Sequence, residues 1–138
     1  MPRVVSCLLV HNGKLLILKR STKVKTYKEY WGAVAGYIEP NEQPYETAVK
    51  EIGEEAGLGT KDITLIVQAE PVTINDVYDG VQYQWVIYPF IFRVTNDSKV
   101  HIDWEHSEYQ WISPDEISQY QTVPYLKEIV RQHLQELR

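Results

Sequence analysis

Apolar and polar positions alternate along the chain in a way that predicts several strands. The first two apolar runs are joined by Asn12-Gly13, a dipeptide typical of tight hairpins. The longest β segment is expected at 81–94, where Pro89 predicts a bulge or an edge position. The predicted strands are 4–10, 15–18, 31–37, runs within 63–74 around Glu70-Pro71, 81–94 and 109–112.

A helical spacing of apolar residues appears at 44–56. Apolar side chains recur there at i, i+3, i+4, i+7 and i+11, which places them on one core-facing stripe. Pro44 suits the first turn of this helix, and Gly57 suits a left-handed cap just beyond its end. The expected stripe consists of Tyr45, Ala48, Val49, Ile52 and Ala56.

The remaining segments complete the plan of an α+β domain. Ser113 and Glu116 have the spacing of a capping box at the start of a helix, and 123–137 predicts a final amphipathic helix. The polar, lysine-rich stretch 21–29 is expected to be a surface loop. Strands, a helix, more strands and then helices predict a mixed sheet in one domain over residues 1–138.

Length and charge narrow the class of protein. The 138 residues suffice for a sizeable core, and the net charge of -5 argues against strong nucleic-acid binding through a basic surface. The single cysteine, Cys7, excludes an internal disulfide framework and is expected to be buried. We see neither a signal-peptide pattern nor a membrane-spanning apolar run, so we expect a cytoplasmic protein without a membrane partner.

The stretch from Gly36 to Leu58 carries the candidate chemistry. Glu51, Glu54 and Glu55 fall at i, i+3 and i+4 of the predicted helix and form a second stripe beside the apolar one. Like charges on adjacent turns repel one another, so a helix selected for stability alone would avoid them. Hard cations prefer carboxylate oxygens, and a bound divalent cation would therefore turn this repulsion into binding.

The spacing of this stretch resembles the Nudix box of the MutT-like Nudix hydrolase family. At one of the nine defined positions, Lys50 stands where the family has arginine. The resemblance covers nearly the whole chain and implies the Nudix α/β/α sandwich, with a mixed β-sheet and the Nudix loop and helix. The eight matching positions are Gly36, Glu42, Glu51, Ile52, Glu54, Glu55, Gly57 and Leu58.

This resemblance implies metal-dependent hydrolysis of a diphosphate linkage in a nucleoside diphosphate derivative, with Mg²⁺ or Mn²⁺ as cofactor. A nucleoside triphosphate, an ADP-ribose-like molecule and a dinucleoside polyphosphate all remain open as the substrate. Homodimers are frequent in the family, and the oligomeric state also stays open. The metal ligands that the resemblance implies are Glu51, Glu54, Glu55, Glu105 and the carbonyl of Ala35, and the implied catalytic residues are Lys50, Glu51, Glu54 and Glu105.

Glu105 is included because several family members place a glutamate six residues before a tryptophan, here Trp111. We favour it over Glu108, although both also suit surface positions in a loop. His106 is expected to be a solvated loop histidine rather than a base.

Two departures from the family keep an alternative function open. Lys50 has the charge of arginine without its planar fork, and Val34-Ala35 replaces the usual Pro-Gly before the box. A catalytically weak nucleotide-binding or sensing module on the same fold is therefore the second hypothesis.

Five residues outside the box are candidates for substrate binding. Arg20 and Lys28 could contact a phosphate, and Trp85, Tyr83 and Tyr88 could stack on a base. A surface charge for Arg20 and a core position for Trp85 are the ordinary explanations that compete with this hypothesis.

Overall fold

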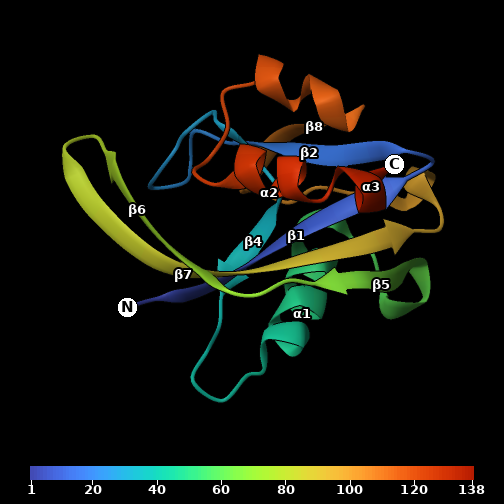
Figure 1. The fold of residues 1–138 in the computed structure, drawn as a ribbon, viewed down its shortest axis with the longest axis horizontal. Helices are drawn as coiled ribbons and strands as arrows, with labels where there is room; N and C mark the ends of the chain where they lie inside the picture. The colour runs from blue at the N-terminus through green and yellow to red at the C-terminus, as the bar shows by residue number, and fades with distance from the viewer.

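The computed structural model describes residues 1–138, apart from the side chain of Ser98. A mixed sheet forms the middle layer, with α1 (Pro44–Ala56) on one face and α2 (Leu126–Gln132) and α3 (Leu134–Leu137) on the other (Figure 1). One apolar core lies between the sheet and α1, and a second lies between the sheet and the C-terminal helices. This is the predicted α/β/α sandwich.

Eight strands form the sheet, and β1 is its centre. It runs parallel to β7 and antiparallel to β2 and β4. The remaining helical segments are short 3-10 turns at Thr60–Asp62, Asp97–Lys99 and Pro114–Gln119. The strands are β1 (Arg3–His11), β2 (Lys14–Arg20), β3 (Trp31–Gly32), β4 (Val34–Tyr37), β5 (Ile63–Gln68), β6 (Val72–Tyr78), β7 (Val81–Val94) and β8 (His106–Ile112).

The first hairpin follows from its sequence. Asn12 and Gly13 have φ values of 50° and 75°, the left-handed pair that a two-residue turn between twisted strands requires. The strands on either side are almost wholly apolar because helices cover both faces of the sheet. Cys7 is 1% exposed, as predicted.

Pro89 does not lie at an edge, because β7 has β1 on one side and β5 and β6 on the other. The bulge that was expected at Pro89 is also absent from β7, whose register with β1 is continuous there; the register shift of this region lies in the neighbouring β5, between Leu65 and Val67. On that side Pro89 faces the crossing from β5 to β6, where its carbonyl accepts a hydrogen bond from the N–H of Ala69 at 2.9 Å. The lack of an N–H is tolerated because the ladder is already interrupted there.

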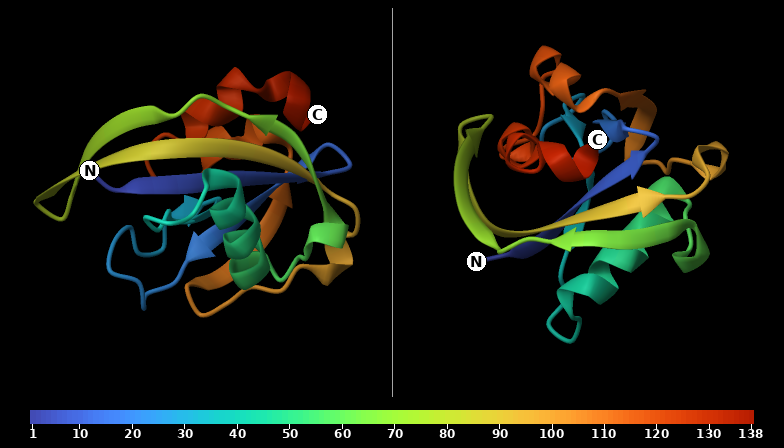
Figure 2. Two further views of the ribbon diagram at one scale, coloured as in Figure 1. Left: turned by 90° about the horizontal axis from the view of Figure 1, so that it is seen from below. Right: turned by 45° about the vertical axis from the view of Figure 1, so that its right-hand side comes forward.

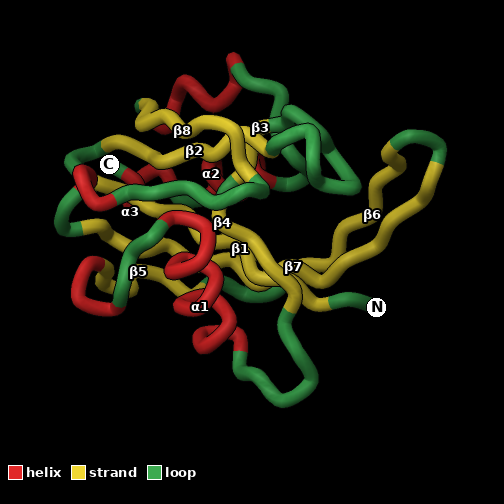
Figure 3. Tube along the Cα trace, turned by 180° about the vertical axis from the view of Figure 1, so that it is seen from behind, coloured by secondary structure: helices red, strands yellow, loops and turns green.

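β6 and β7 continue beyond the body of the sheet as a two-stranded ribbon, residues 74–85. The pairing of β7 with β1 begins at Val86, and the outer part of β7 pairs with β6 up to the turn at Asp79 and Gly80. Figures 2 and 3 show that this β6–β7 ribbon projects from the sandwich and bends out of the plane of the sheet.

Several predicted elements differ in detail. The strand at 31–37 is divided at Ala33, and the strand at 109–112 begins earlier, at His106. The final helix begins at Leu126 rather than 123 and breaks at His133, whose backbone leaves the helical region. The Ser113 N–H donates to Glu116 Oε1 at 2.7 Å, but the segment that it caps is a 3-10 helix.

The buried face of α1 is rotated from its predicted position. Tyr45 was expected in the core and is 44% exposed, whereas Thr47 and Glu55 are buried beside the apolar residues. Gly57 has the predicted left-handed conformation, with φ at 72°. Among the described residues, none of the helices has both the length and the apolar character needed to cross a bilayer.

A candidate active-site cleft

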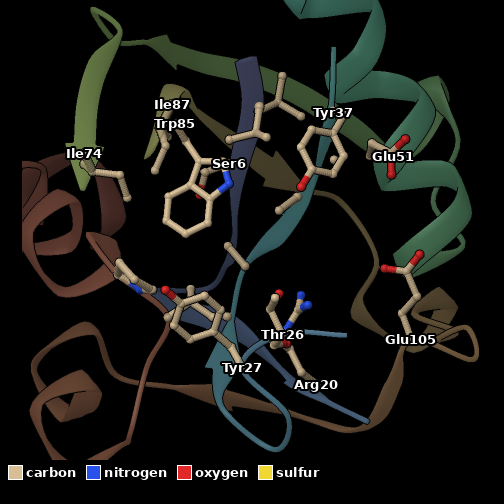
Figure 4. Close-up of a pocket in the computed structure, with 18 of the residues that line it drawn as sticks. Ser6, Arg20, Thr26, Tyr27, Tyr37, Glu51, Ile74, Trp85, Ile87 and Glu105 are labelled. Carbon is tan, nitrogen blue, oxygen red and sulfur yellow. Dashed lines mark hydrogen bonds between the residues drawn. The ribbon is translucent and has the colours of Figure 1, made fainter. Parts of the chain in front are cut away.

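A cleft of about 450 Å³ runs between the sheet and the segment that joins β2 to β3, the 21–30 loop. Figure 4 shows the carboxyl groups of Glu51 and Glu105 at one end of the cleft, and Trp85 with Ile74 and Ile87 at the other. Arg20 lies along the wall between these two ends. The cleft therefore joins an acidic end to an aromatic end.

The acidic end exists because α1 packs closely on the exposed edge of β4. Glu51 lies against Gly36, where an added Cβ would be only 2.6 Å from Glu51 Cγ. A side chain at position 36 would therefore displace the carboxylate of Glu51, so glycine serves here by its small size rather than by its conformational freedom. One turn further along the helix, Glu55 is 2% exposed, and its Oε1 accepts a hydrogen bond from the N–H of Ala35 at 3.2 Å.

The buried Glu55 has an oxygen without a donor. No described residue donates a hydrogen bond to its Oε2. Burial raises the pKa of Glu55 to about 10, and the adjoining carboxyl of Glu51 contributes to the same shift. Burial also raises the pKa of Glu51, and the nearby charge of Glu54 adds to it. Both groups thus resist ionisation unless a positive charge is close to them.

The carbonyl of Ala35 is oriented by the same geometry. The N–H and C=O of one strand residue point to the same edge, so a residue whose N–H reaches Glu55 also directs its carbonyl toward α1. Ala35 is not among the residues with positive φ, which means that alanine is accommodated here without backbone strain.

Lys50 contacts a different glutamate from those of the acidic end. Its Nζ donates to Glu42 Oε2 at 2.7 Å and lies 4.0 Å from Glu51 Oε2. The hydrogen bond from Lys50 lowers the pKa of Glu42, whose Oε1 also accepts from Thr47 Oγ1 at 2.9 Å. Lys50 therefore fastens the loop before α1 to the helix and reaches Glu51 only weakly.

The segment before β8 contributes Glu105 to the cleft, whereas Glu108 is exposed on β8. Burial raises the pKa of Glu105, and the charges of Asp103 and Glu51 raise it further. The prediction for His106 was wrong. Its side chain is 2% exposed and its Nδ1 lies 3.1 Å from Asp103 Oδ1, because β8 begins at His106 and turns it inward.

A divalent cation fits this donor set on chemical grounds. The unpartnered Oε2 of Glu55 is the kind of buried acceptor that a cation satisfies, and Glu51 adjoins it. Within the part of the chain that the structure describes, no three His, Cys, Asp or Glu side chains are already arranged as a complete cation cage. The buried Glu55 and the half-buried Glu51, with a backbone carbonyl beside them, are the preformed part.

Arg20 lies half-buried in the cleft, not on the surface. Its Nε donates to the carbonyl oxygen of Thr26 at 3.0 Å, and no carboxylate among the described residues forms an ion pair with it. Burial lowers its pKa, and the field of Glu105 opposes this shift. An unpaired, partly desolvated guanidinium in a cleft is suited to an anionic ligand.

Two aromatic side chains of β7 form the other end. Trp85 lines the cleft, and Tyr83 stacks on it with ring centroids 5.5 Å apart and an angle of 2° between the rings. Tyr83 itself is not among the lining residues, so it supports the indole from the side of the ribbon tip.

The structure thus gathers most of the predicted residues around one cleft. Seven of them line it, Glu55 lies buried behind the acidic end, and Tyr83 lies behind Trp85. Sequence reasoning missed Tyr27, which lines the cleft although it belongs to the 21–30 loop. The lining residues that were predicted are Arg20, Ala35, Lys50, Glu51, Glu54, Trp85 and Glu105.

Residues 21–29 were expected to form a surface loop, and this is wrong for three of them. Ser21, Val24 and Tyr27 are each less than 9% exposed. An isolated valine and tyrosine among lysines have no periodicity, so the sequence contains no signal for their burial.

The chain is similar to several known proteins. The chain is 30% identical over 122 residues to the nucleoside triphosphatase NudI of Salmonella paratyphi B, covering 86% of each protein. The E. coli dihydroneopterin triphosphate pyrophosphohydrolase has the same fold, with a TM-score of 0.81 and 16% identity over 97% of this chain and 95% of that one. A C. elegans Ap4A hydrolase in a binary complex gives a TM-score of 0.79 at 16% identity, over 99% and 98% of the two chains.

The solved structures show only that the fold is shared, whereas the family model shows to which family the chain belongs. That model, of the NUDIX domain, matches residues 1–133 and so includes the glutamate stretch, the cleft, α1 and α2. The chain therefore belongs to the Nudix hydrolase family and is a Nudix pyrophosphohydrolase.

Proposed function

We propose that this protein hydrolyses a diphosphate linkage of a nucleotide in a reaction that depends on Mg²⁺ or Mn²⁺. The observation that carries the proposal is the buried Glu55, whose Oε2 has no donor among the described residues and whose neighbour is Glu51. A nucleoside triphosphate is the preferred substrate class, since NudI is named as a nucleoside triphosphatase and a cleft of about 450 Å³ has the size of a small-ligand pocket.

The cation would be held by Glu51, Glu55 and the carbonyl of Ala35, with Glu54 and Glu105 at the rim. When bound, it supplies charge neutralisation for the diphosphate and lowers the pKa of a coordinated water. Because hydrolysis of this kind depends on positioning and on charge stabilisation, the protein's own groups act mainly by orienting the substrate.

The other residues have roles that follow from their places in the cleft. Arg20 would bind a phosphate and Trp85 would stack on the base, with Tyr83 supporting the indole. Glu51, Glu54 and Glu105 are the carboxylates available to accept the proton of the attacking water. Lys50 would act by holding the loop through Glu42.

A panel of substrates tests the proposal. Nucleoside triphosphates, ADP-ribose, nucleotide sugars and dinucleoside polyphosphates are each assayed with Mg²⁺, with Mn²⁺ and with EDTA. We expect turnover of a nucleoside triphosphate that requires the metal and that Glu55→Gln abolishes. Unchanged turnover in Glu55→Gln would show that this carboxylate is not a metal ligand.

The contact of Lys50 with Glu42 favours a second candidate, a nucleotide-sensing module with little turnover. A lysine that reaches Glu51 only at 4.0 Å orients that carboxylate less firmly than a planar guanidinium would. Tight, metal-dependent binding of a nucleotide without hydrolysis across the panel would support this candidate.

We also propose that the reaction takes place in the cytoplasm, where nucleotides and Mg²⁺ are abundant. The family also leads us to expect a homodimer. Sedimentation equilibrium of the purified chain, which measures the molar mass in solution, tests this expectation.

A further inference from the structure

The 21–30 loop is fastened to the β6–β7 ribbon by one tyrosine. Tyr27 is 6% exposed, and its hydroxyl donates to Asp76 Oδ2 at 2.6 Å. Its ring lies 4.5 Å from that of Tyr78, whose hydroxyl accepts a hydrogen bond from the N–H of Lys28 at 3.3 Å. The loop and the ribbon are more than forty residues apart in sequence, so these contacts join two walls of the cleft.

The loop has a backbone conformation that needs such support. Tyr27 and Glu29 have φ values of 52° and 67°, in the left-handed region that bulky side chains rarely adopt. A conformation of this kind persists where surrounding contacts hold it. The hydrogen bond to Asp76 and the ring contact with Tyr78 provide that hold.

The loop in turn holds Arg20. The oxygen that accepts from Arg20 Nε belongs to Thr26, directly before Tyr27. Because the peptide group is planar, the carbonyl of Thr26 and the N–H of Tyr27 move as one unit. The backbone N–H of Arg20 also donates to the carbonyl of Tyr30 at 2.9 Å, at the other end of the same loop.

We propose that Tyr27, held by Asp76, is a positioning residue that fixes the guanidinium of Arg20 for the phosphates of the nucleotide. This inference rests on the proposed function, because it assigns the cleft to a nucleotide. Tyr27 remains a donor at neutral pH, since burial and the hydrogen bond to Asp76 raise its pKa. Asp76 serves as the anchor of the tyrosine and does not line the cleft.

A double-mutant cycle tests the coupling. KM and kcat for a nucleoside triphosphate with Mg²⁺ are measured for the wild type, Tyr27→Phe, Arg20→Gln and the double variant. Losing a charge-assisted contact with phosphate should raise KM about tenfold or more in Arg20→Gln. Tyr27→Phe should raise KM about fivefold with little change in kcat, and less than about twofold once Arg20 has been replaced.

Tyr30→Phe is the matched control, because Tyr30 lies in the same loop and its ring packs against Tyr27 and Tyr78. Its hydroxyl makes no hydrogen bond with the described residues, so KM should not change. Asp76→Ala should reproduce the effect of Tyr27→Phe and keeps the test valid if that variant folds poorly.

Two results would overturn the proposal. One is a KM of Tyr27→Phe equal to that of the wild type. The other is an increase that persists in full beside Arg20→Gln, which would show that Tyr27 acts independently of Arg20. If the wild type hydrolyses nothing in the panel, hydrolysis as the proposed function fails. The same cycle, run on the Kd of an α,β-methylene nucleoside triphosphate with Mg²⁺, then still decides the role of Tyr27.

Discussion

Replacing Glu55 by glutamine should make the metal-free protein more stable while removing its response to metal. The folded-state pKa of Glu55 is about 10, compared with 4.5 for the free group, because the side chain is buried. A group whose pKa is raised by folding contributes its full stability below the unfolded pKa and loses it as the pH rises toward the folded pKa. At pH 7.5 the metal-free protein is therefore in the destabilised range.

The size of the effect follows from the pH interval. At pH 7.5 the folded protein keeps Glu55 protonated, whereas the unfolded chain ionises it. Because this pH is about three units above the free pKa, folding loses about 4 kcal/mol of stability relative to low pH. Glutamine imitates the protonated acid. It keeps an acceptor for the N–H of Ala35 and has an NH₂ group that can donate to Glu51.

Thermal unfolding followed by circular dichroism measures both parts. In EDTA at pH 7.5, Glu55→Gln should raise the Tm by up to about 12 °C, at about 3 °C for each kcal/mol in a domain of this size. Mg²⁺ at one hundred times its Kd should add about 2.7 kcal/mol to the free energy of unfolding of the wild type and so raise its Tm. The Tm of the variant should stay almost unchanged.

The exposed Glu54 provides the control, because Glu54→Gln removes a carboxylate from the same helix at a position without a desolvation cost. Its Tm in EDTA should change far less than that of Glu55→Gln, since only its repulsion with Glu51 is lost. The reasoning is refuted if Glu55→Gln melts below the wild type in EDTA, or if it gains as much from Mg²⁺ as the wild type does.

Three further substitutions test other parts of the cleft. Lys50→Arg should raise kcat about threefold, because a planar fork can contact Glu51 as well as the present partner of Lys50; an unchanged kcat would mean that this orientation does not limit the rate. Trp85→Ala should raise the KM for a nucleoside triphosphate about tenfold with kcat nearly constant, as expected for lost base stacking, and a fall in kcat alone would contradict that role. Gly36→Ala should abolish both turnover and the Mg²⁺-dependent rise in Tm, because its Cβ would displace Glu51, whereas Gly53→Ala has its nearest contact at 3.8 Å and should keep both.

The glutamate stretch could be predicted because its information is local. Residues 44–56 form the predicted helix, with Pro44 in its first turn and Gly57 as its left-handed cap. Since the spacing of Glu51 and Glu55 along a helix is fixed, their proximity also followed from the sequence.

Burial could not be predicted in the same way, because it depends on which face meets the sheet. Glu55 belonged to the predicted acidic stripe, yet the packing of α1 on β4 buries it as completely as an apolar residue and leaves Tyr45 partly exposed. His106 and Tyr27 are buried by strands that are distant in the sequence, and no local pattern around either residue indicates this.

Because the β6–β7 ribbon projects from the sheet, its aromatic residues and the glutamates of the acidic end lie on different parts of the fold. The glutamates are anchored to the helix and strands of the buried layers, whereas Trp85 and Tyr83 lie on a ribbon that leaves the sheet at Val86. Substitutions near the tip of the ribbon, where Val77 and Val81 are 63% and 51% exposed, disturb neither core. Under the base-stacking role proposed for Trp85, a substitution on the ribbon would change substrate preference without altering either core.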